Sequence, residues 1–271
     1  MSRAAGGIQH LRTEMDTTGA PAPGAGVSCH GFAEHCGYFH QLAEPLAAAG
    51  FLAVGHDFYG HGLSEGKREP AAVYRHPCGC GCCSFGKLKL EFPDCIVYGV
   101  GYSMGALVLH RMCGRSPQPP LSAMPAGMKL TKRRVQLSKW LLPRLPNLPL
   151  PGGRFRPEDL TRSKETQLHT DTASSSGVLY TRVWRLDAGS YASNRSPGSI
   201  TLHNSAHHGT ADRIADSGSI CALLWPPDRP WQTGDWPGLT WAPGTSCTLD
   251  LPTLASSCNQ DLMQWFAASQ D

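Results

Sequence analysis

The stretch Cys95-Ile96-Val97-Tyr98-Gly99-Val100-Gly101-Tyr102-Ser103-Met104-Gly105 decides the fold that we expect for this chain. It ends in the pattern Gly-x-Ser-x-Gly after a short apolar run, and residues 106–112 can continue as a helix. A serine on so sharp a strand-to-helix turn has strained backbone angles, and side chains at the two glycine positions would clash with the neighbouring strand and helix. We therefore predict that Ser103 lies on such a turn with positive φ. The helix that follows points its positive end at the serine, which favours a developing oxyanion.

Three further motifs accompany this pattern. Residues 27–35 read Val-Ser-Cys-His-Gly-Phe-Ala-Glu-His, residues 55–66 read Gly-His-Asp-Phe-Tyr-Gly-His-Gly-Leu-Ser-Glu-Gly, and residues 208–214 read His-Gly-Thr-Ala-Asp-Arg-Ile. In this order, the four motifs resemble the α/β-hydrolase superfamily, and within it the monoacylglycerol lipase and serine aminopeptidase-like branch. The resemblance covers about residues 27–70, 93–112 and 205–224. It implies an α/β fold, with an α/β-hydrolase sheet and a cap region.

The resemblance also assigns roles to four residues. Ser103 is the nucleophile, and Asp212 is the acid that orients a histidine. The backbone N–H groups of Phe32 and Met104 form the oxyanion hole. The β-prone run 200–202 is the expected end of the strand ahead of the acid. The alternatives are an inert serine on a glycine-rich turn and a solvated loop aspartate, and the resemblance implies neither a metal ligand nor a cofactor.

Several polar residues in the same motifs are expected to have structural roles. Hydrogen bonds to loop backbone would satisfy a buried His30. Further hydrogen bonds would hold the segment after the second strand together, through His56, Asp57, His61 and Ser64.

The general base of the family is missing from its expected place. The family carries a histidine after the last core strand, beyond the acid, but all 12 histidines of this chain precede Asp212. The last is His208, and residues 213–271 contain none. A serine hydroxyl without a base is a poor nucleophile at neutral pH. His207 and His208 are close to Asp212 along the chain, and residues so close rarely reach each other's side chains in the required geometry.

Two functional hypotheses from different classes therefore stay open. The first is a serine ester hydrolase that resembles monoacylglycerol lipase and cleaves acyl esters of glycerol or lysophospholipids through an acyl-serine intermediate, impaired by the missing histidine. The second is a non-catalytic relative that keeps the pocket as a lipid-binding or interaction module, or a defective coding sequence. The sequence does not decide whether the chain is an enzyme.

Other segments depart from the family pattern, so we expect an incomplete sheet. Residues 1–26 read as a flexible leader without strands, and residues 27–271 as a single α/β-hydrolase-like domain with a cap or irregular region at about 113–198. The prolines of 116–120 replace an expected strand, and residues 224–238 do not resemble one. Regular elements are predicted as helices at 41–49 and near 259–266 and as a strand at 51–54.

The segment 78–83, Cys-Gly-Cys-Gly-Cys-Cys, lies where the family has an amphipathic helix. Its glycines disfavour a helix. Thiolates suit zinc and copper, but paired ligands at the usual spacing are absent, so metal binding and an irregular insert are both open.

Charge is distributed unevenly along the chain. Residues 95–157 contain no Asp or Glu, whereas Lys and Arg accumulate from 129 to 156 around the apolar run 140–150. Such a cap would dock on an anionic membrane surface and admit a lipid or small acyl-ester substrate, or it is an ordinary solvated basic segment. The sequence has no nucleic-acid-binding signature, no signal peptide and no run of 18 apolar residues. We expect a protein in the cytoplasm or peripheral to a membrane.

Overall fold

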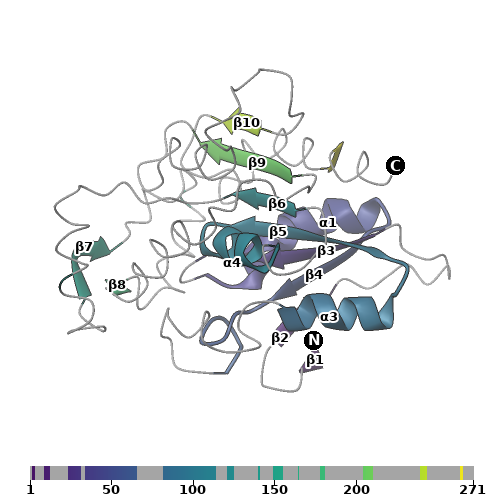
Figure 1. Ribbon diagram of the computed structural model, residues 1–271, viewed down its shortest axis with the longest axis horizontal. Helices are drawn as coiled ribbons and strands as arrows, with labels where there is room; N and C mark the ends of the chain where they lie inside the picture. The colour runs from purple at the N-terminus through teal and green to yellow at the C-terminus, as the bar shows by residue number, and fades with distance from the viewer. Residues whose placement is uncertain are drawn as a thin grey trace.

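A computed structural model gives the fold (Figure 1). The structure describes residues 2–3, 9–12, 24–31, 34–65, 82–113, 121–124, 149–154, 178–180, 204–209, 239–242 and 263–264, together with Trp140 and Lys164. Among these residues, no helix is long and apolar enough to cross a membrane.

The centre of the molecule is an eight-stranded sheet with the order β1-β2-β4-β3-β5-β6-β9-β10. The strands are β1 (Ser2–Arg3), β2 (Gln9–Arg12), β3 (Gly24–Cys29), β4 (Leu52–His56), β5 (Ile96–Tyr102), β6 (Leu121–Met124), β9 (Asn204–Gly209) and β10 (Leu239–Ala242). The six strands from β4 to β10 in this order are parallel; β2 pairs with β4 in antiparallel fashion, and β1 pairs with β2 in antiparallel fashion. Parallel strands all have their carboxyl ends at one edge, where α/β proteins place their sites.

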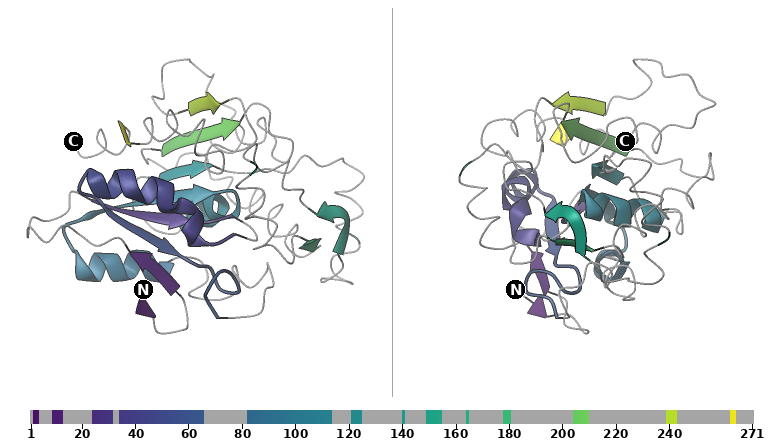
Figure 2. Two further views of the ribbon diagram at one scale, coloured as in Figure 1. Left: turned by 180° about the vertical axis from the view of Figure 1, so that it is seen from behind. Right: turned by 90° about the vertical axis from the view of Figure 1, so that its left-hand side faces the viewer.

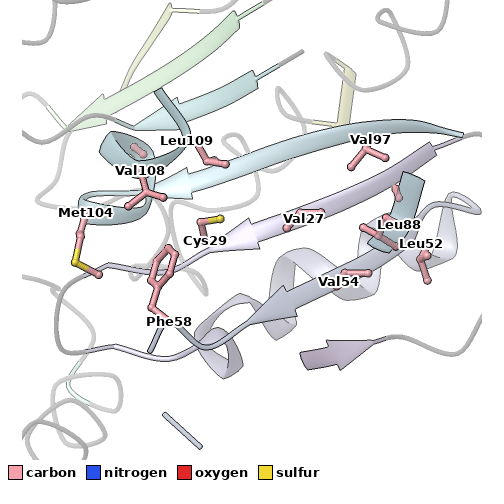
Figure 3. Packing of buried hydrophobic residues seen from close by; sticks show 12 residues of the cluster. Val27, Cys29, Leu52, Val54, Phe58, Leu88, Val97, Met104, Val108 and Leu109 are labelled. Carbon is pink, nitrogen blue, oxygen red and sulfur yellow. The ribbon is translucent and has the colours of Figure 1, made fainter. Parts of the chain in front are cut away.

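Helices cover both faces of this sheet (Figure 2). On one face, α3 (Cys82–Glu91) and α4 (Met104–Cys113) pack through Leu88, Val108 and Leu109 on Ala25 and Val27 of β3 (Figure 3). On the other face, η1 (Cys36–Phe39) and α1 (His40–Ala48) pack on β4 and β5; this second cluster contains Phe39, Leu42, Leu46, Phe51, Ala53, Tyr98 and Val100. Alternation along β5 directs Val97 to the first cluster and Tyr98 to the second, so the central strands are buried on both sides.

Two predicted elements are confirmed with small shifts of their ends. The helix expected at 41–49 is α1, His40–Ala48, and the strand expected at 51–54 is β4, Leu52–His56. Only two residues of the helix expected near 259–266 are described, Met263 and Gln264, and both are helical. Met263 packs against the second apolar cluster, as a core-facing residue should.

The prediction that residues 1–26 form a leader without strands is wrong. They contain β1 and β2, and β3 begins at Gly24. β2 pairs with β4, with His10 opposite His56. Pairing with a strand that already exists supplies the hydrogen bonds, so this short segment forms a strand without a clear alternating pattern.

The strands judged missing after α4 are also present. β6 follows directly after the prolines of 116–120 and pairs with β5, within the range expected to be a cap or irregular region. β10 begins directly after residues 224–238 and pairs with β9. Proline disfavours only the strand position that it occupies, not the residues that follow it. Pairing with a neighbouring strand then determines whether those residues form a strand.

The helix of the cysteine segment is displaced rather than absent. α3 begins at Cys82, just after the glycines, and its Leu88 is buried in the first cluster. Residues 78–81 lie outside the described residues.

A small second sheet lies within the expected cap region. It pairs β7 (Pro149–Arg154) with β8 (Val178–Tyr180) in antiparallel fashion. Both views place these strands beyond the carboxyl ends of the parallel strands (Figures 1 and 2). That position, outside the carboxyl edge of the sheet, fits a cap.

Candidate active site

The predicted serine turn is confirmed. Ser103 stands alone between the end of β5 at Tyr102 and the start of α4 at Met104. Its φ is 50°, and it is the one non-glycine residue with positive φ among those described. Serine avoids this region of backbone space unless its surroundings impose it. The chain therefore holds Ser103 in a strained conformation at the carboxyl edge of the sheet.

The flanking glycines explain how the turn is imposed. A Cβ on Gly105 would collide with the backbone carbonyl of Cys29 and lie 2.7 Å from the carbonyl oxygen of His30. A Cβ on Gly101 would lie 2.6 Å from the backbone of Ala106. The start of α4 thus packs directly on the end of β3, and only glycine permits this approach.

Met104 occupies the first position of α4, as predicted for an oxyanion donor. Its side chain is buried beside Cys29 and Phe58 in the first apolar cluster (Figure 3). Backbone N–H groups in the first turn of a helix lack an intrahelical acceptor and lie at the positive end of the dipole. The geometry suits an oxyanion donor, and the catalytic role of Met104 stays a prediction.

His30 is held by backbone on both ring nitrogens, as predicted. It is fully buried; Nδ1 donates to the Gly31 carbonyl at 2.7 Å, and Nε2 accepts from the Phe58 N–H at 3.0 Å. The Phe58 donor fixes this tautomer. Burial, followed by the nearby His61, lowers the pKa of His30 well below its usual value of 6.5. His30 is therefore a neutral structural histidine.

This burial makes the stability of the protein sensitive to acid. The folded-state pKa of His30 is below that of the unfolded chain, so its contribution is present above about pH 6.5 and is lost as the pH falls toward the folded value. We expect the free energy of unfolding to fall below pH 6.5 with a slope that His30→Gln reduces by up to about 1.4 kcal/mol per pH unit. Urea unfolding at several pH values measures this slope. The exposed His40 provides the control His40→Gln, and equal slopes in both variants would contradict the assignment.

The loop after β4 is held together by the residues expected there. Asp57 accepts from the Cys36 N–H at 2.7 Å and from the Leu63 N–H at 2.8 Å. Ser64 Oγ donates to the Asp57 carbonyl at 2.7 Å. Further contacts join His61 Nδ1 to Tyr59 O at 3.3 Å and His56 Nδ1 to Ser84 Oγ at 2.9 Å. These bonds tie the loop to the start of η1 and to α3.

The sequence reasoning missed one residue of this region, Glu34. Its side chain is only 7% exposed, and Oε2 accepts from the Gly31 N–H at 2.8 Å. Burial raises the pKa of this carboxyl to about 8, against a lowering by the Gly31 hydrogen bond. The available signal was the position of this glutamate, three residues after Gly31 in the motif 27–35.

Two predicted site residues, Phe32 and Asp212, lie outside the described residues. A strand ahead of the acid is described, and it is β9, Asn204–Gly209; the run 200–202, predicted to end this strand, lies outside the described residues. β9 lies two strands from β5, and its carboxyl end is at the same edge as Ser103. Asp212 follows this end by three residues in the sequence. The role of Asp212 stays a prediction.

The described strands show where the histidines of the chain lie relative to the end of the sheet. β10 is the last strand of the sheet, and residues 243–271 after it contain no histidine. His207 and His208 lie within β9.

No group of three or more His, Cys, Asp or Glu side chains that would hold a metal occurs within the part of the chain that the structure describes. Of the cysteine segment, Cys82 and Cys83 form the start of α3. Whether residues 78–83 bind a metal stays open.

The chain is similar to a known protein family and to known lipases. The family model described as "Serine aminopeptidase, S33" matches residues 21–224. Monoglyceride lipase of Mus musculus is 27% identical over 210 residues, which cover 72% of this chain and 67% of the mouse protein.

Solved structures share the fold. Monoacylglycerol lipase of Paleococcus ferrophilus has a TM-score of 0.71 at 20% identity, covering 97% of this chain and 99% of its own. A soluble variant of monoglyceride lipase from Saccharomyces cerevisiae, solved in complex with a substrate analog, has a TM-score of 0.74 at 15% identity, with 97% and 91% covered.

Proposed function

Since the chain belongs to the serine aminopeptidase family of α/β-hydrolases, in its monoglyceride lipase-like branch, we propose that it is a serine ester hydrolase with impaired turnover. Its substrates are acyl esters of glycerol or lysophospholipids. The observation that carries the proposal is the backbone of Ser103, strained at the carboxyl edge of the sheet with the start of α4 beside it. A strand-to-helix turn of this kind exposes a serine hydroxyl to a substrate above the sheet.

The proposed reaction proceeds through an acyl-serine. Ser103 Oγ attacks the ester carbonyl carbon, and the N–H groups of Phe32 and Met104 stabilise the negative oxygen that forms. The C–O bond to the glycerol breaks, and the alcohol leaves with a proton. Water then hydrolyses the acyl-serine and releases the fatty acid. Asp212 would orient the imidazole that moves these protons in a complete triad.

The impairment follows from the missing imidazole. The serine proton has no positioned acceptor, because no histidine follows Asp212 in this sequence. The helix dipole and the oxyanion donors do not depend on that histidine, so residual reactivity toward strong electrophiles is expected. The chain is then a serine hydrolase whose turn positions the nucleophile Ser103 but whose general base is missing.

Substrate class and location are proposed from the relatives and the cap. The relatives named above are lipases of monoacylglycerols. The basic, apolar stretch 129–156 of the sequence includes β7, which lies beyond the carboxyl edge. Such a surface suits contact with anionic lipid. We propose a cytoplasmic protein that meets its lipid substrate at a membrane surface.

Labelling by a fluorophosphonate tests the nucleophile. The probe phosphonylates an exposed, activated serine, so we expect slow, stoichiometric labelling of the wild-type protein at Ser103, located by peptide mass spectrometry. Ser103→Ala should remove the label, whereas Ser64→Ala, at a serine that bonds the Asp57 carbonyl, should keep it. Labelling that persists in Ser103→Ala would contradict the assignment.

A second candidate is a non-catalytic relative that binds lipid, favoured by the absence of histidine from 213–271. It predicts no labelling of a folded protein, together with saturable binding of a monoacylglycerol ether that cannot be hydrolysed. The same purified sample therefore separates the two functions.

A further inference from the structure

The turn that carries Gly31 is fixed from both sides by buried side chains. The Gly31 N–H donates to Glu34 Oε2 at 2.8 Å, and its carbonyl accepts from His30 Nδ1 at 2.7 Å. The Glu34 N–H also reaches the Gly31 carbonyl, at 3.4 Å. Both backbone hydrogen-bonding groups of Gly31 are thus engaged.

This turn lies against the end of β5, which directly precedes Ser103. A Cβ on Gly31 would lie 2.7 Å from Glu34 Oε2 and 2.9 Å from the Tyr102 ring, and Tyr102 directly precedes Ser103. The Glu34 carboxyl, Gly31 and the end of β5 are therefore packed in one layer. A side chain at position 31 would therefore collide with both neighbours.

We propose that Glu34 is a positioning residue: as a neutral carboxylic acid, it holds the turn at Gly31 beside the place where negative charge develops. The inference rests on the proposed function, because it needs Ser103 as the nucleophile. An ionised carboxylate at this position would repel the oxyanion, whereas the neutral acid keeps the same hydrogen bond to the Gly31 N–H without that repulsion.

The surroundings of Glu34 agree with a neutral carboxyl. Burial is the main cause of its raised pKa of about 8, and the Gly31 hydrogen bond is the one opposing cause. Among the described residues, the titratable side chains near the Gly31 turn are those of His30, His35, Asp57, His61 and Tyr102, and none of them is a cause of the shift. Ionisation above pH 8 then places an uncompensated charge beside the site.

The experiment compares the rate of Ser103 phosphonylation by a fluorophosphonate from pH 6 to pH 9.5 in four full-length proteins. These are the wild type, Glu34→Gln, Glu34→Ala and the control Glu44→Gln, at an exposed position of α1. The amide of Glu34→Gln still accepts from the Gly31 N–H and stays neutral at every pH. Circular dichroism establishes that each protein is folded at each pH.

We expect wild type and Glu34→Gln to label alike near pH 7 and to diverge above pH 8, where Glu34→Gln becomes faster by about tenfold. Taking the ratio of the two rates cancels the general rise of serine reactivity with pH. Glu34→Ala should label roughly tenfold more slowly than Glu34→Gln at every pH, because the acceptor for Gly31 is lost. Glu44→Gln should follow the wild type.

The outcomes separate the two proposals. A pH profile that is the same in wild type and Glu34→Gln overturns the inference about Glu34 alone, as does a folded Glu34→Ala that labels as fast as the wild type near pH 7. Absence of labelling at every pH in all four folded proteins overturns the proposed nucleophile, and the inference with it.

Discussion

Purified protein is expected to hydrolyse monoacylglycerol and nitrophenyl esters about 10² to 10⁴-fold more slowly than a relative with a complete triad. The reason is the missing proton acceptor: no residue after His208 is a histidine, and the segment after β10 is equally without one. Members of a triad act as a unit, so the loss should lie near the upper end of this range. Release of nitrophenol over hours, compared with the mouse monoglyceride lipase under the same conditions, measures it.

The control for this expectation is Ser103→Ala, which should remove whatever activity remains. Robust turnover that disappears in this variant would show that a histidine before Asp212, such as His207 or His208, acts as the base. A scan of single histidine substitutions through residues 243–250, after β10, tests the cause directly. Because β10 is formed, one of these positions should restore part of the rate without a change in KM.

The second large effect concerns folding. Gly105→Ala is expected to lower the free energy of unfolding by roughly 3 kcal/mol, because the new methyl group meets the backbone of Cys29 and His30. Backbone atoms of a central strand cannot move aside as the end of a flexible side chain can. Urea unfolding followed by circular dichroism gives the difference.

A matched glycine is available in α3. Gly86 is exposed, and nothing lies within 4 Å of a Cβ placed on it, so Gly86→Ala should raise the stability by about 0.5–1 kcal/mol. An unchanged midpoint in Gly105→Ala would mean that α4 shifts away from β3 without cost, and the rigid turn at Ser103 would then be in doubt.

The sequence predicted the parts of the fold that short-range chemistry determines. Gly101, Ser103 and Gly105 could be placed because the turn allows few residues at these positions. The roles of His30 and Asp57 followed from polar side chains between apolar strands, which need hydrogen-bond partners when buried.

The parts that depend on pairing with distant strands were missed. β2 and β10 are only four residues long, too short for a clear pattern of their own, and are defined by their neighbours β4 and β9. Glu34 was missed for a related reason. Its burial beside Gly31 arises from the packing of the turn against Tyr102, which no local pattern reports.

The distribution of the apolar clusters has a consequence for synthesis on the ribosome. Apart from Met263, every residue of both clusters that the structure describes lies between Ala25 and Leu109 in the sequence, so this part of the core has been synthesised when α4 has emerged. β6 follows within a few residues, but its partner β9 begins about 80 residues later. At translation rates of about 5–20 residues per second, the outer edge of β6 waits roughly 4–16 s for that partner. During this interval the nascent chain presents an open edge to other nascent chains and to chaperones.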